Sequence, residues 1–66
     1  MTTDKWEFRK ALERAGYTQG KLAEEIEVTP RTLSKKVTGE SDFTISEAKK
    51  ICEVLHIEDP LKVFFN

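Results

Sequence analysis

Residues 18–33 read TQGKLAEEIEVTPRTL, and this stretch decides the fold. Thr18 is a good N-cap for a short helix, and Thr29, which precedes a proline, is typical of the residue that begins a second one. Apolar residues fall where the two helices must touch, and the smallest of them, Ala23, allows a close crossing. The stretch therefore predicts two short helices joined by a tight turn around Glu27.

A further helix is predicted on the N-terminal side of this pair. Asp4 followed three residues later by Glu7 resembles a capping box, and Gly16 supplies a left-handed end. Between them the apolar residues recur at helical spacing on one stripe: Phe8, Ala11, Leu12 and Ala15.

Two more helices are predicted on the C-terminal side. Gly39 ends the second helix of the pair, residues 40–43 form a loop, and Thr44 with Glu47 makes another capping box. His56 ends this fourth helix, because histidine tolerates the left-handed conformation better than most residues. Its apolar stripe is expected to be buried: Ile45, Ala48, Ile51, Cys52 and Leu55.

The C-terminal segment opens with Asp59 and Pro60, a start signal for a fifth, short helix. That helix is expected to contain the remaining apolar residues of the chain: Leu61, Val63, Phe64 and Phe65. With 66 residues in total, the chain is long enough for one domain. The sequence thus predicts an all-α, five-helix fold in a single domain over residues 1–66.

Composition excludes several classes of protein. Hydrophobic residues make up 38% and charged residues 35% of the chain, which is typical of a globular protein and not of a disordered one. No apolar run approaches the roughly 20 residues of a membrane span, and the N-terminus does not read as a signal peptide. The single cysteine fits a reducing compartment, so we expect a cytoplasmic protein.

Charge is distributed unevenly along the chain. The net charge is −1, which does not by itself suggest nucleic acid. Between residues 29 and 39, however, Arg31, Lys35 and Lys36 occur without any acid. Such a cluster on its own is most often a solvated helix face. On the second helix of a closely packed pair, whose N-terminus is free to enter the major groove, it favours contact with DNA.

No catalytic or metal-binding set is visible. The sequence has no nucleophile–histidine–acid combination and no phosphate-binding glycine loop. Cys52 and His56 are too few to complete a zinc site of four protein ligands, and Cys52 is expected to be a core thiol. We therefore expect no enzyme, no cofactor, no metal and no small-molecule substrate.

Residues 17–34, with Thr-Gln-x-x-Leu-Ala followed by Val-Thr-Pro, resemble the helix-turn-helix of Cro-like phage repressors. Residues 43–65 resemble the small Cro-like regulators of phages and prophages of Gram-positive bacteria. The resemblance implies a five-helix, lambda-repressor-like domain with a central helix-turn-helix, which binds a pseudo-palindromic operator in double-stranded DNA, usually as a homodimer. It would act as a sequence-specific transcriptional regulator in the cytoplasm of a bacterial host.

The resemblance also implies roles for individual residues. Four side chains of the second helix of the pair would face bases: Pro30, Arg31, Thr32 and Lys35. Polar residues around them would contact phosphates: Thr18, Gln19, Ser34, Lys36, Thr38, Ser41 and Thr44. Two departures from the family pattern matter. Glu27 occupies a turn position that is often glycine, and Glu40 and Asp42 follow the second helix, where acids would weaken binding to phosphates.

Dimerisation would have to use this same small domain. The apolar residues available for a dimer face or for C-terminal packing are Trp6, Val63, Phe64 and Phe65. Trp6 lies off the core stripe, so it either packs against the C-terminal phenylalanines or belongs to a dimer face. An alternative function is a protein-interaction module with the same fold, which would bind a repressor or another phage or host factor. The acids near the motif favour that alternative, whereas the acid-free interval 29–39 favours DNA.

Overall fold

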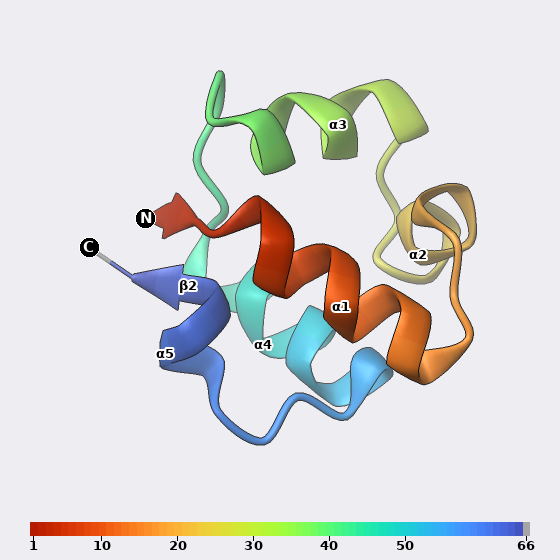
Figure 1. The fold of residues 1–66 in the computed structure, drawn as a ribbon. Helices are drawn as coiled ribbons and strands as arrows, with labels where there is room; N and C mark the ends of the chain where they lie inside the picture. The colour runs from red at the N-terminus through yellow and green to blue at the C-terminus, as the bar shows by residue number, and fades with distance from the viewer. Residues whose placement is uncertain (66) are drawn as a thin grey trace.

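The computed structural model describes residues 1–65, which form five helices and two very short strands. In chain order these are β1 (Thr2–Thr3), α1 (Lys5–Ala15), α2 (Gln19–Glu25), α3 (Pro30–Thr38), α4 (Ile45–Leu55), α5 (Pro60–Val63) and β2 (Phe64–Phe65). α3 lies along one edge of the molecule, and α1 and α4 lie beside each other below it (Figure 1). The all-α, five-helix prediction is confirmed.

Each of the four longer helices begins at a polar residue whose side-chain oxygen accepts a hydrogen bond from a backbone N–H of the first turn: Asp4, Thr18, Thr29 and Thr44. The capping box at Thr44 is complete, since the Glu47 carboxylate also accepts from the Thr44 amide at 2.9 Å. Only one of the two bonds of the predicted box at Asp4 forms. The Asp4 carboxylate accepts from the Glu7 amide, whereas the Glu7 carboxylate accepts from Lys10 at 3.2 Å and not from the Asp4 amide.

Four residues with positive φ allow the chain to change direction between helices. Gly16 (φ 72°) and Gly39 (φ 92°) end α1 and α3, and His56 (φ 54°) ends α4. Glu27 (φ 61°) lies in the turn between α2 and α3, as the sequence predicts. A residue with a side chain is strained in this region, so the conformation of Glu27 modestly lowers the stability of the folded state.

The core lies where all five helices converge. Its buried side chains are Phe8, Ala11, Leu12, Leu22, Ala23, Ile26, Leu33, Val37, Phe43, Ala48, Ile51, Leu55, Val63 and Phe64. The rings of Phe8 and Phe43 stack at 6.3 Å between centroids, and Phe64 meets Phe43 edge-on at 5.3 Å. These three aromatic residues connect α1, the loop before α4 and the C-terminal segment.

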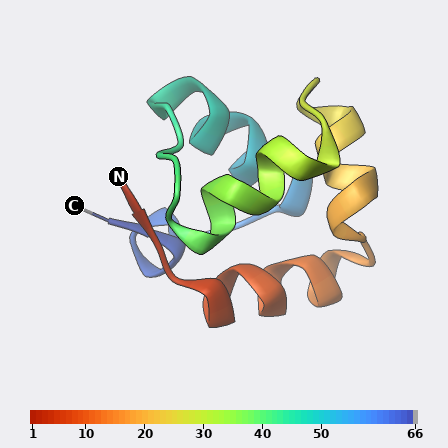
Figure 2. The same ribbon diagram turned by 90° about the horizontal axis from the view of Figure 1, so that it is seen from above.

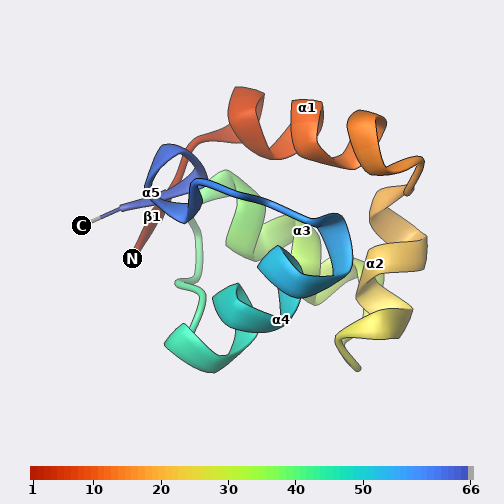
Figure 3. The same ribbon diagram turned by 90° about the horizontal axis from the view of Figure 1, so that it is seen from below.

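The C-terminal segment differs from the prediction. α5 ends at Val63, and Phe64 and Phe65 are extended and pair antiparallel with residues 2–3 (Figure 3). Alternation along this strand buries Phe64 and leaves Phe65 exposed, whereas a helix would not satisfy the backbone groups of residues 2–3. Asp59 also makes no side-chain capping bond. Val63 and Phe64 are therefore core residues, as the C-terminal packing role requires.

Three apolar residues outside the core also bear on the predictions. Ile45, expected on the buried stripe, is 69% exposed, because it is the first residue of α4 and precedes the turn that packs on the core. Trp6 is 74% exposed and so lies outside the core. Cys52 is half-buried, and this burial raises the pKa of its thiol, which favours the neutral form.

The left-handed turn at Glu27 leads to a prediction about stability. Glu27→Gly removes the strain of a left-handed residue with a side chain, which amounts to about 1–2 kcal/mol. Glycine also loses more backbone entropy on folding, and this loss offsets about 0.5–1 kcal/mol of the gain. We expect the free energy of unfolding in urea to rise by up to about 1.5 kcal/mol. The control Glu24→Gly places glycine inside α2 and should lower it by about 1 kcal/mol. Equal losses in both variants would show that Glu27 is not strained.

Candidate nucleic-acid interface

α2 and α3 pack closely against each other across a short turn. Leu22 and Ala23 of α2 and Leu33 of α3 are completely buried, and the Val28 amide donates to the Ala23 carbonyl at 3.0 Å. Because Ala23 is small, the two helices approach without displacing the core. The N-terminus of α3 is thereby presented at the surface, next to the end of α2.

One face of α3 is uncovered along its length. Figure 2 looks down onto α3, which crosses this side of the molecule between α1 and α4, with α2 beside its N-terminal end. Pro30, Arg31 and Lys35, three of the four predicted base-contacting residues, are exposed, and Thr32 is half-buried. The structure therefore brings the predicted residues together on one helix surface.

Thr32 is held in place by the N-cap of its own helix. The Thr29 hydroxyl accepts a hydrogen bond from the Thr32 amide at 3.1 Å and donates to the Thr32 hydroxyl oxygen at 2.9 Å. Since the Thr32 oxygen already accepts, the proton of its hydroxyl remains available for an external acceptor. The cap thus fixes the position of the Thr32 hydroxyl, which keeps hydrogen-bonding capacity for an external group.

The predicted phosphate-contacting residues surround α3, but they are not equivalent. Most are at least partly accessible to solvent: Thr18, Gln19, Ser34, Ser41 and Thr44. The Thr38 hydroxyl is exposed as well, yet it donates to the Lys35 carbonyl at 3.2 Å, which leaves it an acceptor in this arrangement. Thr18 and Thr44 serve as N-caps in addition.

Lys36 differs from the rest of that set because its charge is already paired. Its ammonium contacts both oxygens of Glu47, at 2.7 and 2.9 Å, and lies 5.9 Å from the centre of the Phe43 ring. Only 14% of its side chain is exposed. Lys36 therefore joins α3 to α4, and its ammonium is engaged there and not held free for a phosphate.

The same contact shifts the titration of Glu47. Burial alone would raise the pKa of this carboxyl, but hydrogen bonds from Lys36 and from the Thr44 amide outweigh that effect. The pKa of Glu47 consequently lies below its ordinary value. The carboxylate form is the one that holds both Lys36 and the first turn of α4 in place.

The structure adds two residues that the sequence reading did not assign to the site. Lys5 and Arg9 of α1 line a hollow of about 160 Å³ that also includes Gln19, Ser34 and Thr38. The sequence does place Lys5 and Arg9 on one face of a helix, because they are four residues apart. It does not show that this face of α1 lies beside α3.

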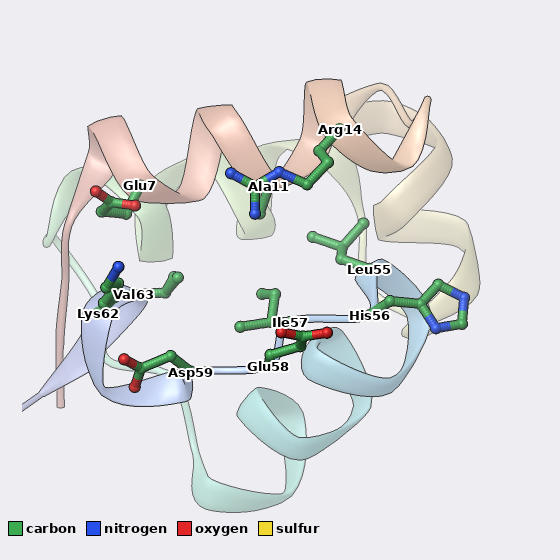
Figure 4. Close-up of a pocket in the computed structure, with 10 residues that line it drawn as sticks. All are labelled: Glu7, Ala11, Arg14, Leu55, His56, Ile57, Glu58, Asp59, Lys62 and Val63. Atoms are coloured by element: carbon green, nitrogen blue, oxygen red, sulfur yellow. The ribbon is translucent and has the colours of Figure 1, made fainter.

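A larger hollow, of about 350 Å³, lies on the other side of α1 (Figure 4). Both carboxylates and cations line it, among them Glu7 and Arg14 on α1 and Lys62 on α5. Within residues 1–65, no group of three or more His, Cys, Asp or Glu side chains is placed to hold a metal ion. Among these residues, no helix is both long and apolar enough to cross a membrane.

Comparison with known proteins concerns the same segment. Residues 8–60 match the model of a protein family described as helix-turn-helix. The match runs from α1 to the start of α5 and includes all of α2, the turn and α3. No curated protein and no solved structure matches the chain.

The pair formed by Lys36 and Glu47 predicts a pH-dependent loss of stability. Because the folded-state pKa of Glu47 is lowered, its contribution is complete above the ordinary value of 4.5 and is lost as pH falls through the folded value. We expect Glu47→Gln to lower the free energy of unfolding at about pH 7 by roughly 1–2 kcal/mol. At an acidic pH below the folded-state pKa of Glu47, the two proteins should converge.

Urea unfolding at both pH values measures this effect, and the exposed Glu13→Gln variant is the matched control. A deficit of Glu47→Gln that is equally large at both pH values would show that the carboxylate charge contributes nothing.

Proposed function

The chain belongs to the helix-turn-helix family of Cro-like DNA-binding transcription regulators, and from this premise we propose that it represses transcription by binding a specific operator through the major groove. This family consists of DNA-binding regulators and not of enzymes. A bacterial cytoplasm, with a phage or prophage as the source of the gene, is part of the proposal, since residues 17–34 resemble phage repressors.

The exposed face of α3 carries this proposal. It is basic and free of acids between residues 29 and 39, and its N-terminal end is uncovered. Arg31 can pair with the two acceptors of a guanine, and Lys35, one turn later, can reach a guanine or a phosphate. Pro30 and the methyl group of Thr32 provide apolar contacts for thymine, while the free hydroxyl proton of Thr32 suits a base acceptor.

Selection from random duplex DNA, at low and at physiological salt, tests the function as a whole. Enrichment of a sequence motif supports an operator-binding protein. If the folded protein enriches nothing at either salt, the alternative becomes preferable: a protein-interaction module that uses the exposed acids of α2 and the turn, Glu24, Glu25 and Glu27.

Arg31→Ala is expected to reduce discrimination at one operator position by about 1–3 kcal/mol, because alanine cannot pair with two acceptors of one base. Titration of the variant against the selected operator and its single-base changes measures this. Arg14→Ala, which removes the same charge on the far side of α1, should leave discrimination unchanged. Equal weakening of Arg31→Ala on specific and random DNA would instead make Arg31 a phosphate contact.

Dimerisation is part of the proposal, and the exposed apolar residues suggest where it occurs. Ile45 and Leu61, which is 77% exposed, flank a hollow of about 480 Å³ between α4 and α5. Lys49 and Glu53 lie on the rim of this hollow, one turn apart on α4. Two copies related by a two-fold axis, with antiparallel α4 helices, would pair Lys49 with the partner's Glu53 twice. A second copy of this chain is therefore the proposed occupant.

This arrangement predicts a rescue by exchanged charges. Lys49→Glu alone should weaken cooperative binding to a two-fold-symmetric operator by at least about tenfold, since two attractive pairs of about 0.5–1 kcal/mol each are lost and replaced by repulsive ones. The double variant Lys49→Glu, Glu53→Lys should restore it. Titration of full and half operators measures cooperativity separately from DNA contact. Failure of the double variant to recover, with normal half-site binding, would exclude this interface.

A further inference from the structure

The side of α1 that faces α3 carries two cations outside the helix-turn-helix. Lys5 and Arg9 are exposed and lie one turn apart on α1. With Gln19, Ser34 and Thr38 they line the hollow of about 160 Å³ described above. This volume far exceeds the roughly 10–15 Å³ that one water molecule requires. Three helices thus contribute polar side chains to one accessible recess.

Most of the donors of this recess are free within the part of the chain that the structure describes. Among residues 1–65, no ion pair and no side-chain hydrogen bond involves four of its side chains: Lys5, Arg9, Gln19 and Ser34. Lys10, on the same helix, is instead bound to Glu7 at 3.2 Å. The recess therefore combines two uncompensated positive charges with an amide and a hydroxyl, which is a suitable set of donors for a phosphate oxygen.

Trp6 extends the same surface outward. Its indole is 74% exposed, and together with Lys5 and Arg9 it forms a second shallow hollow. A large apolar side chain this exposed has little effect on the core, so its position beside two cations calls for another explanation. An indole offers an apolar face to a deoxyribose and an N–H donor to a phosphate.

We propose that Lys5, Trp6 and Arg9 bind the sugar–phosphate backbone of the operator beside the groove that α3 enters. This inference rests on the proposed function and adds a third helix to the DNA interface. Contacts of this kind raise affinity and fix the orientation of the protein without reading base sequence. They also compensate for Lys36, whose charge is paired with Glu47 and is not available to DNA.

Two double variants of α1 test the proposal. Lys5→Ala, Arg9→Ala removes two charges on the side facing α3. Lys10→Ala, Arg14→Ala removes the same net charge, and Arg14 lines the hollow on the opposite side (Figure 4). The slope of log affinity against log salt falls by about 0.9 for each phosphate that the protein no longer neutralises. We expect a decrease of about two for the first variant and a much smaller change for the second.

Trp6 provides a second readout, because it is the only tryptophan in the chain. Saturating duplex DNA should protect its fluorescence from quenching by acrylamide. Equal slopes for the two variants, or quenching of Trp6 that DNA does not change, would overturn the inference while leaving operator binding intact. If the unchanged protein binds no duplex DNA at any salt concentration, the proposed function fails and this inference fails with it.

Discussion

The position of α3 depends on how closely it crosses α2. Ala23 and Leu33 are completely buried at that crossing, and the turn is held by the bond from the Val28 amide to the Ala23 carbonyl. A larger side chain at position 23 would push the helices apart, because a packed core has no space to absorb added atoms. The orientation of every side chain on the outer face of α3 is therefore set by apolar contacts on its inner face. Recognition and core packing are not separable here.

Much of the fold could be predicted from the sequence because its signals are local. Each helix start at Asp4, Thr18, Thr29 and Thr44 depends on a bond within three residues, and the left-handed turns at Glu27 and His56 depend on single residues. The exposed face of α3 followed from the same periodicity. The base and phosphate roles of its residues remain predictions.

The features that could not be predicted depend on contacts between distant segments. Lys36 meets Glu47 eleven residues away, and nothing in the local sequence separates it from its exposed neighbour Lys35. Phe64 is extended and not helical, because its ring is needed against Phe43 and its backbone pairs with residues 2–3. Lys5 and Arg9 could be placed on one helix face from their spacing, but only the packing of α1 shows which helix that face meets.

The pairing of β1 with β2 has a consequence for the order of folding. It joins residues 2–3 to residues 64–65, so its formation closes a loop that contains nearly the whole chain. Loop-closure entropy rises with loop length, whereas the helices form from contacts only a few residues apart. Closure of so long a loop therefore favours formation of the ladder after the helices have packed, and the ladder contains only two residue pairs. The ring of Phe64 packs against Phe43 in the core, and β1 also contacts α3, so this late pairing ties both ends of the chain to the rest of the fold.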